Sequence, residues 1–165
     1  QIMMNGKDVR NMNPVELRRS IGYVIQQIGL MPHMTIRENI VLVPKLLKWS
    51  KEKKDEKAKE LIKLVDLPEE YLDRYPAELS GGQQQRVAIA RAIINDPKFI
   101  IADEPTGALD SKTSQDIMEL FVKLNKEQNT TIIMVTHDRE VAEKADRIIH
   151  ILDGRVQKEE VLTRE

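Results

Sequence analysis

The chain has 165 residues, of which 41% are hydrophobic, and its 26 basic and 27 acidic residues leave a formal net charge of −1. This length and composition are typical of one soluble globular domain. The near-neutral balance gives no electrostatic reason to expect nucleic acid or anionic lipid as the main partner. Cysteine is absent, which excludes disulfides and thiolate metal sites. Because no apolar run is long enough to span a bilayer, any membrane role would need a partner chain.

Short strand and helix signals alternate in the N-terminal part. An Asn5-Gly6 pair follows the strand-like Gln1–Met4 and predicts a hairpin turn or strand end. Asn13, with proline directly after it, predicts the start of a short helix. The apolar Ile21–Ile25 predicts a buried strand, and Gln26 stands at its end.

The next segment, residues 31–95, has a helical pattern. Thr35 with an acidic residue three positions later forms a capping box, which predicts a helix running through Val43. Ser50 caps a charged helix with one apolar face, and Pro68–Tyr75 predicts a further short helix. We therefore expect a helical subdomain, inserted into the rest of the fold and carrying apolar stripes of its own.

Ser80 opens the most distinctive helix of the chain. Gln83, three residues later, completes a variant of the capping box. Gly81 and Gly82 occupy the first turn, where helix propensity alone disfavours glycine. Glycine there allows the backbone to approach a ligand, and the free N–H groups of a helix N-terminus suit an anion such as phosphate. An ordinary capped helix after a glycine-containing turn is the alternative interpretation.

After residue 95 the pattern changes to strand, helix, strand. Phe99–Ala102 and Thr131–Val135 are continuous apolar runs, typical of buried parallel strands. A helix with one apolar stripe, Ser111–Lys126, separates them, and Asp138 caps another short helix. A hairpin through Asp153-Gly154 follows. The sum is a parallel α/β core with a helical insertion and an antiparallel flank.

Polar residues follow both of these strands. Asp103 and Glu104 come after the first strand, at the edge where open α/β sheets bind ligands. Neighbouring strand residues point to opposite sides, so one carboxylate could hold Mg²⁺ while the other orients an attacking water. His137 follows the second strand and could hydrogen-bond a γ-phosphate or a catalytic carboxylate. The alternative interpretation of Asp103 and Glu104 is the start of a helix, and that of His137 is a surface residue whose hydrogen bonds are satisfied.

Taken together and in this order, the motifs resemble those of the ATP-binding-cassette (ABC) ATPases, specifically the nucleotide-binding subunit of an ABC transporter. Gln26 is similar to the glutamine of the family's Q-loop, and Leu79–Gln83 to its signature motif. Phe99–Asp103 is similar to Walker B, and Glu104 to the catalytic base. Ala108–Asp110 resembles the D-loop, and His137 the switch histidine.

This resemblance implies an α/β fold with the parallel sheet core of the P-loop NTPases. It places 1–165 in a partial nucleotide-binding domain, with the helical subdomain at 31–95 and the Walker B, D-loop and switch-histidine part at 96–165. It also implies ATP and Mg²⁺ as cofactors, with Asp103 and Gln26 serving the metal. Glu104, His137 and Gln26 are then the catalytic residues.

The same resemblance implies a head-to-tail dimer with a second nucleotide-binding subunit. Ser80, Gly81, Gly82 and Gln83 would bind a nucleotide held mainly by the other subunit. Asp110 would cross the interface and couple the two sites. Transmembrane permease subunits would be the further partners, which implies a peripheral location at the cytoplasmic face of the membrane.

The sequence departs from the family pattern in one respect. It contains no Gly-x-x-x-x-Gly-Lys-Ser/Thr, the P-loop or Walker A motif that cradles the phosphates. The strand-like start at Gln1 indicates a beginning inside a domain. We therefore expect an N-terminally truncated member that, alone, neither binds ATP tightly nor hydrolyses it. The missing P-loop strand would leave sheet edges unpaired, so we also expect poor solubility or association.

The transported substrate is harder to infer, because two segments disagree. Gly22–Trp49 resembles importers of glycine betaine, choline and related osmoprotectants, whereas Ala102–Thr113 resembles the lipoprotein-release and macrolide-export group. The first segment carries more weight, since permeases of the family dock near the Q-loop. Two other classes remain as alternatives: a non-catalytic module that completes a partner's ATP site, and an ABC ATPase of DNA maintenance. The second lacks support, because the interval from 26 to 79 has no sustained heptads.

Overall fold

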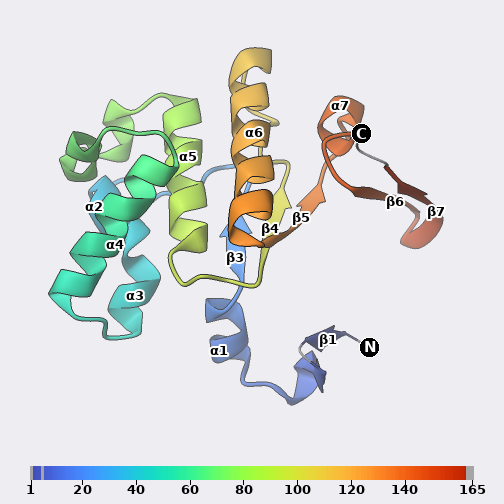
Figure 1. Ribbon diagram of the computed structural model, residues 1–165, viewed down its shortest axis with the longest axis horizontal. Helices are drawn as coiled ribbons and strands as arrows, with labels where there is room; N and C mark the ends of the chain where they lie inside the picture. Colours follow the sequence, from blue (N-terminus) through green and yellow to red (C-terminus); the bar gives the residue numbers. More distant parts are fainter. Residues whose placement is uncertain (1, 5, 163–165) are drawn as a thin grey trace.

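A three-stranded parallel sheet lies at the centre of the computed structural model, which describes residues 2–4 and 6–162. Its strands are β3 (Gly22–Val24), β4 (Phe99–Asp103) and β5 (Thr131–Val135), in the order β3-β4-β5. The three predicted strands are therefore confirmed, with the first one shorter than expected. Their carboxyl ends all lie at the same edge of the sheet (Figure 1).

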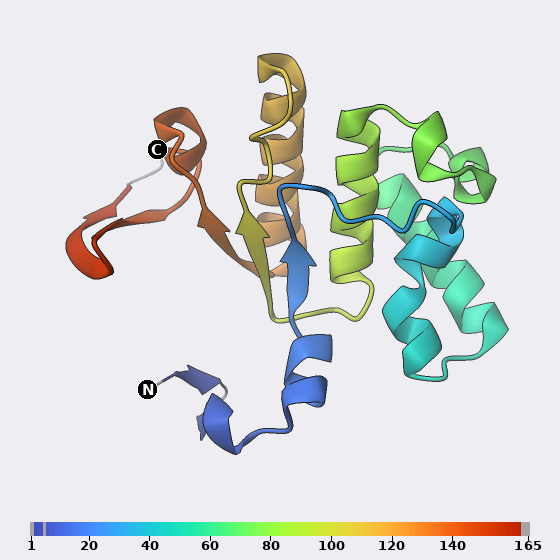
Figure 2. The same cartoon turned by 180° about the vertical axis from the view of Figure 1, so that it is seen from behind.

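Two long helices cover one face of this sheet. These are α5 (Gly81–Ile93) and α6 (Ser111–Gln128); in Figure 2, α6 lies behind the strands and α5 stands next to β3. The backbone contact is close: a Cβ added to Gly22 would lie 2.6 Å from the carbonyl oxygen of Ala92 on α5. Ile100 and Ala102 point to this side and are fully buried.

The opposite face of the sheet is exposed, which corrects the prediction of fully buried parallel strands. Within the described residues Tyr23 is 48% exposed, Ile133 50% and Val135 54%. Successive strand residues point to opposite faces, so one set packs on the helices while the other set remains about half exposed among the described residues. An apolar run indicates a strand that can be covered on both sides, but not which segment covers it.

The helical segment contains more breaks than expected. Before α5, its α-helices are α2 (Ile36–Ile40), α3 (Leu42–Leu46) and α4 (Lys51–Leu64), followed by the 3₁₀ turns η2 (Glu69–Asp73) and η3 (Pro76–Glu78). The single helix predicted through Val43 is therefore wrong, because it divides at Val41. Pro44 explains the break: it has no N–H for the carbonyl of Ile40, and its ring would collide with that carbonyl in a continuous helix.

Asn39 is a buried polar residue that ties the helical segment to the loop before it. Its side-chain oxygen accepts from the Met31 N–H at 2.7 Å. Its amide nitrogen lies 3.0–3.2 Å from the carbonyl oxygens of Met31, Met34 and Thr35. Asn39 is fully buried, so these bonds satisfy polar groups that water cannot reach.

The two ends of the chain form hairpins outside the sheet. At the N-terminus β1 (Met3–Met4) pairs with β2 (Lys7–Asp8), which confirms a hairpin, although Gln1 and Asn5 of the prediction lie outside the described residues. The 3₁₀ turn η1 (Val9–Asn11) and α1 (Pro14–Arg19) follow, and Asn13 caps α1 as expected. At the C-terminus α7 (Arg139–Ala142) precedes the antiparallel β6 (Arg147–Leu152) and β7 (Arg155–Val161).

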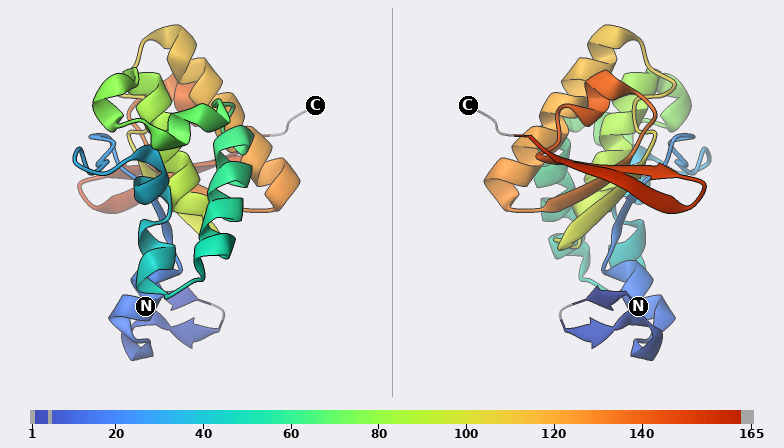
Figure 3. Two further views of the ribbon diagram at one scale, coloured as in Figure 1. Left: turned by 90° about the vertical axis from the view of Figure 1, so that its left-hand side faces the viewer. Right: turned by 90° about the vertical axis from the view of Figure 1, so that its right-hand side faces the viewer.

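An apolar groove of about 560 Å³ separates β5 from β6. Its walls come from α6, β5, α7 and β6, and include Phe121, Ile132 and Ile148. The β6–β7 hairpin lies to the right of β5 in Figure 1, and in the right-hand view of Figure 3 it lies in front of the rest of the molecule. Within the described part of the chain, no helix is both long and apolar enough to cross a membrane.

Candidate active site

Glu104 and His137 meet at the edge where β4 and β5 end. The Glu104 N–H donates to the carbonyl oxygen of Val135 at 2.9 Å, which extends the ladder by one residue. Its carboxylate oxygen Oε1 lies 2.6 Å from His137 Nδ1 and accepts from the His137 N–H at 3.0 Å. The other oxygen, Oε2, accepts from the Thr136 hydroxyl at 3.2 Å. Of the two partners proposed for His137, the structure therefore shows the carboxylate.

The electrostatics of this pair follow from the contact. The hydrogen bond to Glu104, and then its negative charge, raise the pKa of the His137 imidazole. The Glu104 side chain is only 17% exposed, whereas that of His137 is 85% exposed. A carboxylate has about four lone-pair sites, and three donors leave one site on Oε2 for a water molecule. The arrangement can orient and polarise such a water.

The loop that carries Glu104 has an unusual backbone. Glu104 itself has a positive φ of 44°, and its carbonyl accepts from the Gly107 N–H at 3.1 Å. Gln85 of α5 is 1% exposed and donates to the Pro105 carbonyl at 2.8 Å. The side-chain oxygen of Gln85 is buried with no hydrogen-bond partner in the described residues. Helix α5 is thus bonded to this loop through the buried side chain of Gln85.

Gln26 lies against the same loop. It occupies the turn after β3, and a Cβ added to Gly107 would come within 3.1 Å of its Nε2 atom. Asp103, the last residue of β4, is exposed at this edge. The structure therefore brings Gln26, Asp103, Glu104 and His137 to one edge of the sheet, as their strand-end positions predict.

These residues suit Mg²⁺ in kind. Among the described residues no group of three or more His, Cys, Asp or Glu side chains could hold a metal ion. Mg²⁺ in phosphate-processing sites uses one or two protein carboxylates and takes its remaining oxygens from phosphates and water. The exposed carboxylate of Asp103 and the amide oxygen of Gln26 fit that requirement.

Ser80 begins α5 with the predicted capping box. Its hydroxyl oxygen accepts from the Gln83 N–H at 3.3 Å, while the Gln83 side-chain oxygen accepts from the Ser80 N–H at 2.9 Å. The two glycines that follow have different surroundings. A Cβ on Gly81 would lie 3.6 Å from Leu109, an ordinary contact, but on Gly82 it would lie 2.4 Å from Thr113 Cγ2. Gly82 is therefore required by packing against α6, a reason the sequence did not reveal.

Asp110 caps α6 beside this helix start. Its carboxylate accepts from the Thr113 hydroxyl at 2.6 Å and from the Thr113 N–H at 3.1 Å. These two bonds lower the pKa of Asp110. Because Thr113 also packs on Gly82, the structure places Asp110 and Ser80–Gln83 in one group, at the end of the helices that the strands point toward (Figure 2).

Three residues of the site were not predicted: Thr136, Gln85 and Arg91. Arg91 of α5 donates to the carbonyl oxygens of Gly29 at 2.7 Å and Ile28 at 3.1 Å, in the loop after Gln26. Burial lowers the pKa of its guanidinium. A visible signal existed, because Arg91 falls on the apolar stripe of its helix.

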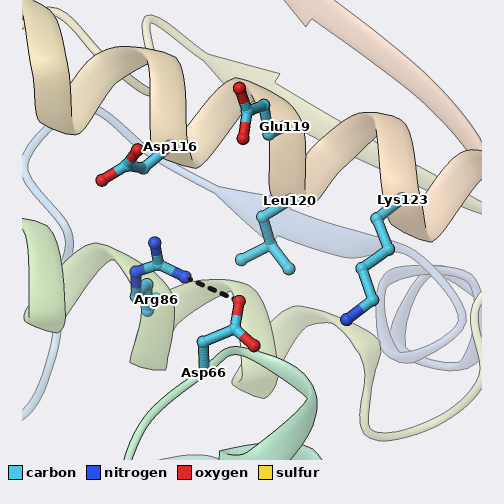
Figure 4. Close-up of a pocket in the computed structure, with 6 residues that line it drawn as sticks. All are labelled: Asp66, Arg86, Asp116, Glu119, Leu120 and Lys123. Atoms are coloured by element: carbon cyan, nitrogen blue, oxygen red, sulfur yellow. Dashed lines mark hydrogen bonds and ion pairs between the residues drawn. The ribbon is translucent and has the colours of Figure 1, made fainter.

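A small pocket of about 180 Å³ lies between α5 and α6 and contains none of the predicted site residues. Figure 4 shows its mixed charges, with Arg86 paired to Asp66 at 3.3 Å. The acidic residues Asp116 and Glu119 line its other side. We assign it no part in the site.

Comparison with known proteins agrees with the motif order. The model of the family described as ABC transporter matches residues 1–107. The carnitine transport ATP-binding protein OpuCA of Listeria monocytogenes is 65% identical over 157 residues, which are 94% of this chain and 40% of that protein. The glycine betaine/carnitine/choline transport ATP-binding protein OpuCA of Bacillus subtilis is 57% identical, over 94% of this chain and 41% of that protein. The chain thus spans about 40% of the length of these curated relatives.

A solved structure is similar throughout the described fold. The dimeric post-hydrolysis state of the ATP-binding cassette MJ0796, bound to ADP and Pi, comes from Methanocaldococcus jannaschii. It superposes with a TM-score of 0.82 at 43% sequence identity, covering 98% of this chain and 73% of that chain. The parallel sheet and its helices match this cassette, which confirms the predicted fold class.

Proposed function

This chain belongs to the ABC transporter family, and on that premise we propose that it is part of an ATP-hydrolysing subunit that powers transport through a separate membrane permease. The observation that carries the proposal is the contact between Glu104 and His137 at the sheet edge. Glu104 polarises the attacking water through its remaining lone pair, and His137 contacts the γ-phosphate. Gln26 and Asp103 bind Mg²⁺ and hold the attacking water.

The second group of residues acts on the nucleotide of another subunit. In a head-to-tail dimer, Ser80, Gly81, Gly82 and Gln83 contact ATP held mainly by the partner. The Ser80 oxygen already accepts from Gln83, which leaves its hydroxyl proton for a phosphate oxygen. Asp110 lies beside this group and is the residue we propose to couple the two sites. The dimeric, ADP-bound and Pi-bound state of the similar cassette supports this arrangement.

We propose the same domain boundaries as the sequence indicates: a helical subdomain at 31–95 within a nucleotide-binding domain, and the Walker B, D-loop and switch-histidine part at 96–165. The packing of α2 and α4 with α5 supports the first unit. Because α5 also packs on β3, this helix joins the subdomain to the sheet.

The groove between β5 and β6 is the place we propose for the P-loop strand of the full-length subunit. Both walls carry apolar side chains, and among the described residues β5 pairs only with β4 and β6 only with β7, so each strand has one unpaired edge. Residues 1–165 alone are then expected neither to bind ATP tightly nor to hydrolyse it. A strong, Mg²⁺-dependent ATPase rate from the purified 165 residues would contradict this. Mixing them with a P-loop-bearing subunit tests whether they complete a partner's site.

We propose an osmoprotectant such as carnitine, choline or glycine betaine as the transported substrate, with the subunit attached to its permease at the cytoplasmic face of the membrane. The names of the relatives support transport of these quaternary ammonium compounds, and one relative, an osmoprotectant import ATP-binding protein of Salmonella typhimurium, supports import. Uptake of labelled carnitine, choline and glycine betaine by cells with and without the subunit tests the assignment. Uptake of all three that is equal in the two strains would contradict it.

The catalytic assignment is tested in the full-length subunit by Glu104→Gln. This change removes the charge that polarises water and keeps the shape of the side chain. We expect loss of turnover with retention of an ATP-bound dimer. Glu143→Gln, at the exposed carboxylate that follows α7 and pairs with Arg139, is the matched control and should hydrolyse ATP normally. Unchanged hydrolysis by Glu104→Gln would refute the assignment.

A further inference from the structure

The loop after Gln26 has a backbone conformation that its sequence disfavours. Ile28 has a φ of 61° and Gly29 a φ of 62°, so two successive residues are left-handed. Glycine adopts this conformation without cost, but a β-branched isoleucine is an outlier there. The Ile28 N–H donates to the Ile25 carbonyl at 3.0 Å and closes a turn around Gln26. Something outside the loop must maintain this turn.

Arg91 is in the position to do so. Its two side-chain hydrogen bonds end on the neighbouring carbonyl oxygens of Ile28 and Gly29, at 3.1 and 2.7 Å. The planar fork of a guanidinium suits two adjacent acceptors, which the single ammonium of lysine cannot match. The guanidinium is partly buried, and these two carbonyl oxygens replace hydrogen bonds that water would otherwise provide.

The same helix also holds the loop of Glu104. Gln85, which precedes Arg91 by six residues on α5, donates to the Pro105 carbonyl. One rigid helix therefore contacts both loops, and Gln26 meets the second loop at Gly107. The distance between Gln26 and the Glu104 loop then depends on two contacts of α5, that of Arg91 with the loop after Gln26 and that of Gln85 with the Glu104 loop.

We propose that Arg91 is a positioning residue, which holds the strained turn at Ile28 and thereby keeps Gln26 against the loop of Glu104. This inference rests on the proposed function, because it assigns Arg91 to the same site. Arg91 acts only through the backbone that carries Gln26 and does not touch the nucleotide.

The test uses the full-length subunit with Arg91→Met. Loss of the two guanidinium hydrogen bonds should destabilise the turn, so we expect the Ile28 amide hydrogen to exchange at least about tenfold faster than in wild type. The ATPase kcat should fall about ten- to hundred-fold, since a small misplacement of a catalytic group has that effect. The Kd for ATP should change less than about threefold, because the phosphate contacts are elsewhere. Arg91→Lys, whose kcat and Ile28 exchange rate should lie between those of wild type and Arg91→Met, replaces Arg91→Met if that variant does not fold.

A second change separates positioning from general stability. Ile28→Gly removes the conformational penalty, so the double variant with Arg91→Met should recover most of kcat. Ile28→Val keeps the β-branch and should not rescue. Arg86→Met is the matched control, because Arg86 donates from the same helix to the Val65 carbonyl at 3.0 Å, and Ile28→Gly should not improve that variant.

Two results would overturn the proposal: Ile28 exchange within about twofold of wild type in Arg91→Met, or no rescue of kcat by Ile28→Gly. The exchange measurement does not depend on hydrolysis. If wild type and Glu104→Gln hydrolyse ATP equally, the proposed function fails, while the exchange rate still decides whether Arg91 holds the turn.

Discussion

Gly82→Ala separates two reasons for the paired glycines at the start of α5. The added Cβ would lie 2.4 Å from Thr113 Cγ2, whereas ordinary van der Waals contact begins at 3.4 Å. Thr113 cannot rotate freely, because its hydroxyl donates to Asp110 at 2.6 Å. Overpacking costs about 1–3 kcal/mol, whereas alanine gains at most about 1 kcal/mol in helix propensity. We expect Gly82→Ala to lower the free energy of unfolding by about 1–2 kcal/mol.

A double-mutant cycle, measured by urea denaturation, identifies the cause. Thr113→Ser removes Cγ2 and retains the hydroxyl that bonds Asp110, and the next contact, with Thr113 Cβ, is 3.7 Å away. In that background Gly82→Ala should be neutral or stabilising, which gives a coupling energy of about 1–3 kcal/mol. Gly81→Ala, with its nearest contact at 3.6 Å, is the matched control and should not destabilise. Equal losses for Gly81→Ala and Gly82→Ala would refute this reasoning.

Three further changes test other contacts. The pKa of His137, followed by NMR, should lie above its ordinary value and fall toward that value in Glu104→Gln; an unchanged midpoint would contradict the contact. The pair should therefore stabilise the fold fully below pH ~6.5, and this stabilisation should be lost as the pH rises through the pKa of the folded state. Asn39→Ala should lower the free energy of unfolding by about 3 kcal/mol, because it leaves buried backbone groups unpaired, and a loss below ~0.5 kcal/mol would show that water replaces the side chain. The hydrogen bond from Arg139, followed by those from two other basic side chains, lowers the pKa of Glu160 to about 2. Its stabilisation should therefore be present above pH ~4.3 and disappear as pH falls toward 2, and Glu160→Gln should flatten that part of the stability profile.

Local interactions explain which parts of the fold were predictable. The capping boxes at Thr35 and Ser80 and the Asn13 cap involve groups within three residues of one another, so the sequence contains all of their parts. The break at Val41 was also predictable in principle, since Pro44 removes the donor that a continuous helix needs there. The uncovered face of the sheet was not, because it depends on what packs there.

The site was predictable to the level of the sheet edge. Strand-end positions place Glu104 and His137 together, because parallel strands end on the same side. Their 2.6 Å contact and the positive φ of Glu104 depend on the register between β4 and β5, which no local pattern contains. Arg91 and its acceptors are more than sixty residues apart in the chain, so only the folded structure shows this pair.

The central claim is that Ser80 of one subunit and Glu104 of the other serve the same ATP molecule. A mixed dimer of full-length Glu104→Gln and Ser80→Arg subunits, purified through two different tags, tests it directly. If the sites form in trans, one of the two contains only unchanged residues, and about half of the wild-type ATPase rate should return although each variant alone is inactive. If Ser80 and Glu104 serve one nucleotide within the same subunit, both sites of the mixed dimer are damaged. A mixed dimer as inactive as its parents would contradict the account.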